Sequence, residues 1–270
     1  MVPAKPHLAK TSTVCIGAAI AALALAACSA KPPAKSGVSE AASPEASYVV
    51  PPRVDAVSVS PAGVSLSGQA AAGGGVRLAS PAGEALLATA DPRGRWTILL
   101  PPAGEPRVFG LSATAQARQT QAEGYVLVTP TGQAALLRAG TGALRIDRPT
   151  RSGLQAIDFD RGGGLEVSAS VAPGATVILR LDGRQAAEGR ADAGGHYEAS
   201  LASSTPIRSG THQLQVFGDG FSDQVVVKLT PAAPLAAGPL RSQFTPAGLR
   251  VDWMTPGGGL QTTQLLGGTQ

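Results

Sequence analysis

The chain has 270 residues and carries 22 Lys and Arg against 18 Asp and Glu, a formal net charge of only +4. Its arginines are scattered singly, which excludes the dense basic patch of a nucleic-acid-binding protein. Charged residues make up 15% and aromatic residues 4%, whereas Gly (34) and Pro (22) are abundant. This composition favours many short strands joined by turns over long helices.

We interpret residues 1–27 as an export signal. Lys5 and Lys10 give a basic start, and the apolar run from Val14 to Ala27 has signal-peptide length and is too short to span a bilayer as a helix. The run ends in Leu25-Ala26-Ala27-Cys28, which resembles the lipobox of bacterial lipoproteins. The resemblance implies that Cys28 is diacylated and becomes the first residue of the mature chain. The alternative is ordinary secretory cleavage at an Ala-x-Ala site.

Lipidation of Cys28 would define both the anchor and the compartment. Two acyl chains hold a protein on a membrane stably, whereas one chain does so only marginally. Ser29 follows the cysteine, and in the lipoprotein sorting pattern the absence of Asp at this position points to the outer membrane. We therefore predict an outer-membrane lipoprotein of the cell envelope that faces the periplasm. Its single remaining cysteine is committed to lipid, so no disulfide can form within the mature chain.

Residues 28–52 are predicted to form a disordered tether. The stretch is rich in Pro, Ala, Ser and Lys and offers almost nothing to bury. In a polyproline-like state it would reach on the order of 70 Å. We expect this tether to let the folded part stand clear of the membrane surface.

An internal repeat organises the rest of the chain. It emerges when the segment from Gly63 is laid on the segment from Gly164 without gaps, and apolar residues alternate with others inside each copy. The matched pairs include Val76 and Val177, Leu78 and Leu179, Asp91 and Asp192, Gly94 and Gly195, and Trp96 and Tyr197. Self-similarity of this kind predicts two copies of one unit, and the period of two predicts strands with one buried face.

The second copy resembles the short Ig-like domains of bacterial envelope and surface proteins. It carries their turn pattern in Pro173-Gly174, Asp182-Gly183, Ala191-Asp192 and Gly195-His196-Tyr197, whereas the first copy has Gly74-Gly75 in place of Pro-Gly. The resemblance implies an all-β fold of two tandem Ig-like β-sandwiches. It implies little about function, because such sandwiches host many unrelated functions.

A second, shorter repeat predicts a β-hairpin after each sandwich. The two hairpin segments begin at Thr129-Pro130-Thr131-Gly132 and at Thr245-Pro246-Ala247-Gly248. The predicted units are the first sandwich with its hairpin, the second sandwich, and a Pro-rich spacer with a C-terminal hairpin or tail, at 53–148, 153–231 and 232–270. The sequence leaves open whether the sandwiches are docked or hinged around residues 149–153.

Few residues are candidates for catalysis or for metal binding. Asp91 and Asp192 each open an Asp-x-x-Gly turn, in which Asp bonds its own backbone, so we interpret them as turn residues rather than as a catalytic pair. Only His196 and His212 remain after the signal, and the segment 158–166 lacks the oxygen-ligand spacing of a calcium loop. We predict no catalytic residues, no metal site and no cofactor.

The segment 249–263 is the place where the sequence suggests a binding surface. It has a hairpin pattern with a Pro-Gly-rich turn and carries Trp253 and Arg250 among polar neighbours. Trp and Arg are residues that interfaces favour as anchors, and an exposed strand edge here would add to a partner sheet. The alternative is that Trp253 closes the end of the second sandwich's core.

Together these features predict a non-enzymatic, lipid-anchored spacer or interaction module whose partner is another envelope protein. A carbohydrate- or peptidoglycan-binding module that uses the strand aromatics Trp96 and Tyr197 is the alternative, although few aromatics are present. An enzyme or enzyme inhibitor is a third class, opposed by the shortage of His, Cys and clustered carboxylates.

Overall fold

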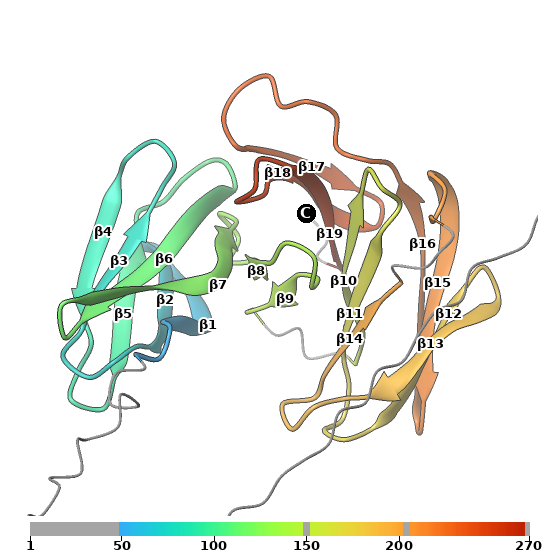
Figure 1. The fold of residues 1–270 in the computed structure, drawn as a ribbon, viewed down its shortest axis with the longest axis horizontal. Coiled ribbons are helices and arrows are strands. Elements are labelled where there is room, and N and C mark those ends of the chain that lie inside the picture. Colours follow the sequence, from blue (N-terminus) through green and yellow to red (C-terminus); the bar gives the residue numbers. More distant parts are fainter. Residues whose placement is uncertain (1–48, 148–151, 202–205, 268–270) are drawn as a thin grey trace, which may run out of the picture. The chain divides into compact units, whose positions relative to one another are not determined.

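The computed structural model describes residues 49–147, 152–201 and 206–267. The predicted signal, Cys28 and nearly all of the predicted tether lie outside the described residues. The described ranges form strands β1 to β19 in antiparallel sheets (Figure 1). They contain no helix of the length and apolarity needed to cross a membrane. The predicted all-β fold of two Ig-like sandwiches with added hairpins is confirmed.

The first sandwich has two layers. Sheet β1-β2-β5 packs against β4-β3-β6-β7, and burial alternates along the strands, as in β5, where Trp96, Ile98 and Leu100 face the core. The strands are β1 (Arg53–Ser60), β2 (Gly63–Gln69), β3 (Gly75–Ala79), β4 (Ala85–Thr89), β5 (Arg95–Leu100), β6 (Arg107–Ala115) and β7 (Arg118–Val128). The fourth strand pairs with the third, whereas in antibody constant domains it belongs to the opposite layer.

The second sandwich repeats this strand order. Sheet β14-β11-β10 packs against β13-β12-β15-β16, so β10 to β16 correspond to β1 to β7. The strands are β10 (Gly153–Asp160), β11 (Leu165–Ser170), β12 (Thr176–Leu181), β13 (Arg184–Arg190), β14 (His196–Ser200), β15 (Gly210–Gly218) and β16 (Phe221–Leu229). Trp96 and Tyr197, matched in the sequence repeat, occupy equivalent buried positions in β5 and β14.

The remaining strands widen one layer of each sandwich. Strands β8 (Ala134–Leu137) and β9 (Leu144–Arg145) continue the first sandwich's sheet beyond β7. Strands β17 (Leu240–Thr245), β18 (Gly248–Met254) and β19 (Leu260–Leu266) continue the second sandwich's other layer, because β19 pairs with β10. Both layers thereby reach six strands. The sequence pattern indicated the β18–β19 hairpin but not β17, which lies inside the predicted spacer and tail.

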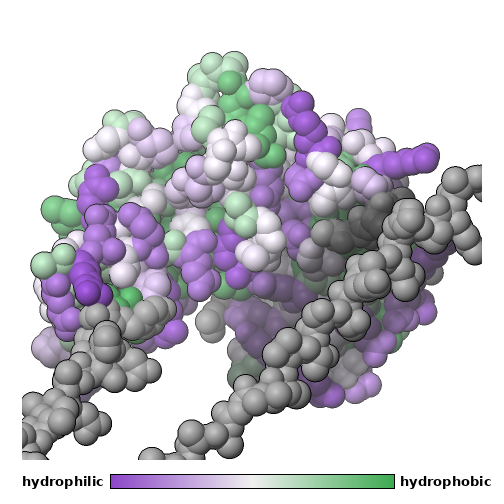
Figure 2. Space-filling model, viewed as in Figure 1, coloured by the Kyte–Doolittle hydropathy of each residue, from purple (hydrophilic) through white to green (hydrophobic). Residues whose placement is uncertain are grey.

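Three hydrophobic cores result. Each sandwich has its own, and a third core joins β6, β7 and the β8–β9 segment to β10, β18 and β19. Its buried residues are Val108, Leu127, Ala135, Leu137, Ala143, Ala156, Leu249, Val251, Trp253 and Leu265. Elsewhere, hydrophobic residues gather over the loop between β16 and β17, at the top of the view in Figure 2. In this third core the hairpins of the two sandwiches pack on each other.

Candidate functional site

The two aspartates of the repeated turn have a structural role. The Asp91 carboxylate accepts main-chain N–H groups two and four residues along at 2.8 and 2.9 Å, and Asp192 does the same at 2.7 and 2.9 Å. These bonds, above all from the N–H groups of Arg95 and His196, hold the pKa of each carboxyl below its ordinary value. The interpretation as turn residues is confirmed, and a lowered pKa is the opposite of what a general acid needs.

His212 also serves a turn. Its Nδ1 lies 2.7 Å from the Asp182 carboxylate, and its Nε2 lies 2.9 Å from the main-chain oxygen of Arg208. The pKa of Asp182 is lowered, first by the N–H of Gln213 and then by His212. These bonds hold the β12–β13 turn against β15. Within the described ranges, no group of three or more His, Cys, Asp and Glu side chains is arranged to hold a metal ion.

Trp253, the predicted anchor, is buried. Its side chain is only 1% exposed, its indole N–H donates to Thr263 Oγ1 at 2.9 Å, and its ring meets Tyr125 edge-to-face with centroids 6.1 Å apart. Tyr125 belongs to β7 of the first sandwich. The expectation of an exposed Trp253 anchor is therefore corrected, because the hairpin turns this face inward. The alternative, in which Trp253 closes the second sandwich's core, was right that the side chain is buried. Trp253 lies, however, in the third core, which both sandwiches share, rather than in the second sandwich's own core.

A buried carboxylate, that of Asp158, lies at the same contact between the two sandwiches. Asp158 of β10 is 2% exposed and accepts the Thr263 hydroxyl, Gln261 Nε2 at 2.9 Å and the main-chain N–H of Ala143 at 2.6 Å. Ala143 lies between β8 and β9, so this last bond joins the first sandwich's hairpin to the second sandwich's sheet. Burial raises the pKa of the Asp158 carboxyl to about 6. Sequence reasoning considered the segment only as a calcium loop and missed this role.

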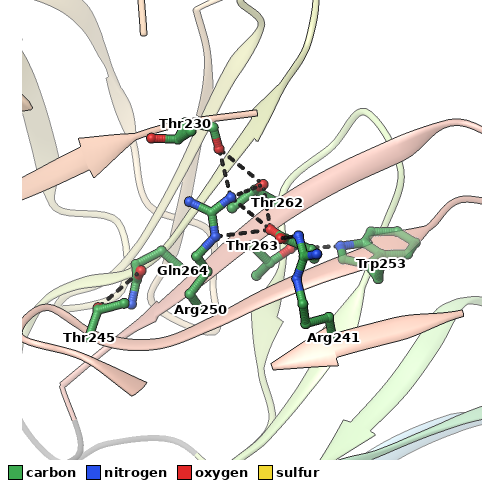
Figure 3. A network of polar contacts seen from close by, with 9 residues as sticks. Thr230, Arg241, Thr245, Arg250, Trp253, Thr262, Thr263 and Gln264 are labelled. Carbon is green, nitrogen blue, oxygen red and sulfur yellow. Dashed lines mark hydrogen bonds and ion pairs between the residues drawn. The ribbon is translucent and has the colours of Figure 1, made fainter. Parts of the chain in front are cut away.

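Arg250 lies on the opposite face of β18 from Trp253, in a network of polar contacts (Figure 3). Its guanidinium bonds Asp252 through Nε at 3.0 Å and the main-chain oxygen of Thr230 through Nη2 at 2.8 Å. Arg241 pairs with the other oxygen of Asp252, whose side chain is 4% exposed. Arg250 is itself 18% exposed, so most of its charge serves this network rather than the surface.

The network belongs to a surface that we call the polar shelf: Arg241, Gln243, Arg250, Asp252, Thr262 and Gln264. Strand register places these residues in two rows across β17, β18 and β19. All of the shelf except Thr262 lines a hollow of about 640 Å³, which β16 and residues 230–233 bound on the other side. The exposed edge expected for the β18–β19 hairpin is also corrected, because both strands are paired on both sides and β17 forms the edge instead.

Comparisons with known proteins show only distant likeness. No protein-family model and no curated protein matches the chain. Among solved structures, it is similar to the BSP domain of a biofilm-associated protein, with 15% identity and a TM-score of 0.24 over 68% of this chain. It is also similar to the central fibronectin-III array of RIM-binding protein, with 12% identity and a TM-score of 0.24 over 79% of this chain and 87% of that one. The chain spans only 30% of the biofilm-associated protein's chain.

Proposed function

We propose that this protein is a lipid-anchored envelope protein whose two sandwiches act as one interaction module without catalysing a reaction. The observation that carries the proposal is the third core. It consists largely of residues on β8, β18 and β19, strands outside the two seven-stranded sandwiches, together with Ala143 between β8 and β9, and it joins the sandwiches to each other. Hairpins used in this way suit a spacer or scaffold, in which the distance between the anchor and the contact surface has to be kept.

The anchor is supported by the sequence Leu25-Ala26-Ala27-Cys28. Expression of the wild type beside Cys28→Ser, followed by separation of membranes from soluble contents, tests it. We expect the wild type in the outer-membrane fraction, released only by detergent, with an N-terminal peptide that carries acyl chains. The variant is expected in the soluble fraction. A wild type that stays soluble, or is cleaved at another site without added lipid, would refute the anchor.

The glycan-binding alternative depends on aromatic side chains that can stack on sugar rings. Trp96, Tyr197 and Trp253 are 2%, 3% and 1% exposed, so none of them offers a ring face without unfolding. We therefore favour a protein partner over cell-wall glycan. Cosedimentation with purified peptidoglycan separates the two, since the protein should stay in the supernatant. Saturable cosedimentation would favour the glycan instead.

Interaction itself is tested with a photo-crosslinking residue placed on the polar shelf. Gln243 is exposed on β17 and suits this purpose, and Arg184, exposed on β13, is the matched control position. We expect the probe at Gln243, and not the one at Arg184, to capture one discrete envelope protein in cells. Equal labelling from both positions would contradict a specific contact at the shelf.

A further inference from the structure

The polar shelf is left uncovered because the layers of the second sandwich differ in width. One layer, β14-β11-β10-β19-β18-β17, has six strands, and the facing layer, β13-β12-β15-β16, has four. Strand β16 ends the narrower layer. The hollow runs along its edge, since Val226 and Lys228 from one face of the strand and Val227 from the other all line it. One further strand beside β16 would continue the narrower layer over the shelf.

The edge of β16 is suited to pairing with another strand. Terminal strands present unpaired main-chain groups, and natural proteins usually protect them by shortness, proline or inward-pointing charges. Strand β16 has nine residues without proline and contains Val225-Val226-Val227. Val226 is 61% exposed on its outer face. The strand also carries Lys228 and Asp223, whose carboxylate accepts the main-chain N–H of Leu154, but along Val225-Val226-Val227 its edge is apolar. An edge of this kind can accept an extended peptide that adds to a sheet.

The charge around the hollow selects the kind of strand that fits. Arg241 is 47% exposed and Lys228 is exposed, and both line the hollow. The amide nitrogen of Gln264 is buried there without an acceptor among the described residues. The shelf's one carboxylate, Asp252, already accepts bonds on both oxygens. Donors and positive charge are therefore in excess, and an acceptor-rich, negatively charged occupant would satisfy them.

We propose that the hollow binds an extended acidic segment of a partner protein. The segment adds as a fifth strand along β16, so that its main chain bonds the edge and its alternate side chains place carboxylates over the shelf, near Arg241. Main-chain bonds supply the affinity in this mode of recognition, and side chains supply the specificity. The inference rests on the proposed interaction function and names the class of partner and the strand that receives it.

The probe is a labelled, end-blocked peptide in which glutamate alternates with valine, titrated into the full chain in detergent and followed by fluorescence anisotropy. We expect saturable binding that weakens as salt is added, and amide protection in hydrogen exchange confined to β16. Arg241→Gln should weaken binding by about two- to fivefold, the range of a partly exposed ion pair. Arg184→Gln, the matched control on β13, should leave binding unchanged.

Three results with the peptide alone would overturn the inference. They are no saturable binding, equal binding of the peptide with lysine in place of glutamate, and protection on a strand other than β16. Displacement of the peptide by an anionic oligosaccharide that itself protects β16 from exchange would also overturn it, by assigning the hollow to a sugar. None of these results touches membrane anchoring, which the Cys28→Ser fractionation tests separately.

Discussion

The buried carboxylate of Asp158 is expected to make the folded protein less stable as the pH rises from 4 to 7. Its pKa is about 6 in the folded state against an ordinary value of 3.8. Between these two values the folded state holds a proton that the unfolded chain has already lost, so folding stability falls with rising pH in this window. A difference of this size corresponds to about 3 kcal/mol.

The effect can be isolated because the other shifted aspartates act elsewhere on the pH scale. The pKa values of Asp91, Asp182 and Asp192 are lowered, so these groups contribute stability above pH 4 and lose it only in stronger acid. Glu166, on β11 opposite Asp158, has a pKa raised mainly by burial, and it adds a smaller slope of the same sign. The fall between pH 4 and 7 should therefore be due chiefly to Asp158.

Urea unfolding at intervals from pH 4 to 7.5 measures this, with Asp158→Asn as the test variant. The asparagine oxygen can still accept from Thr263 and Gln261, but its NH2 group meets the N–H of Ala143, which costs about 1–3 kcal/mol. The variant should be less stable than the wild type at pH 4.5 and show a much flatter profile. Asp160→Asn, an exposed neighbour, should keep the wild-type slope. A flat or rising wild-type profile, or a full slope in Asp158→Asn, would refute the reasoning.

Three further substitutions test the packing, each by its shift in the urea midpoint. Trp253→Ala should cost about 3–5 kcal/mol through the cavity it leaves in the third core, whereas Leu99→Ala, at a side chain 49% exposed, should change stability by about 0.5 kcal/mol or less. Gly248→Ala should cost about 2 kcal/mol or more, because φ is +129° and the new Cβ would lie 2.1 Å from the main-chain oxygen of Leu265. Gly257→Ala meets no atom within 4 Å and should be nearly neutral. Asp252→Ala should lower the free energy of unfolding by about 3 kcal/mol, since two arginines lose their shared partner. A midpoint equal to that of the control variant, or for Asp252→Ala equal to that of the wild type, would contradict the assigned role.

The strands of the two sandwiches were predictable because local chemistry determines them. Alternation of apolar residues identifies strands such as β3 and β12, and Asp-x-x-Gly turns separate β4 from β5 and β13 from β14. The repeat then showed that one arrangement occurs twice. Strand β17 was not predictable in this way. Its sequence, Leu-Arg-Ser-Gln-Phe-Thr, buries little, and it is a strand because β18 offers an edge to pair with.

The site was harder to predict, because the roles of Trp253 and Arg250 depend on which face of β18 each occupies and on what covers that face. The two residues are an odd number of positions apart, so they point to opposite sides of the strand. Sequence alone grouped them as one anchor. The structure separates them, with Trp253 against the first sandwich and Arg250 on the polar shelf. Only long-range pairing, β19 with β10, decides which face meets which neighbour.

The β8–β9 segment and strands β17 to β19 depend on each other, because each covers an apolar face of the other. The β8–β9 segment widens the four-stranded layer of its sandwich, and β17 to β19 widen the three-stranded layer of the other, so the extra strands differ in the layer they extend. Each extension carries buried apolar residues that neither sandwich's own core accommodates. An apolar face of this size left open to water would invite association with other surfaces. Because each hairpin covers the other, the contact that joins the sandwiches is also what keeps these faces from solvent, and the polar shelf on the far side of β18 is left free for a partner.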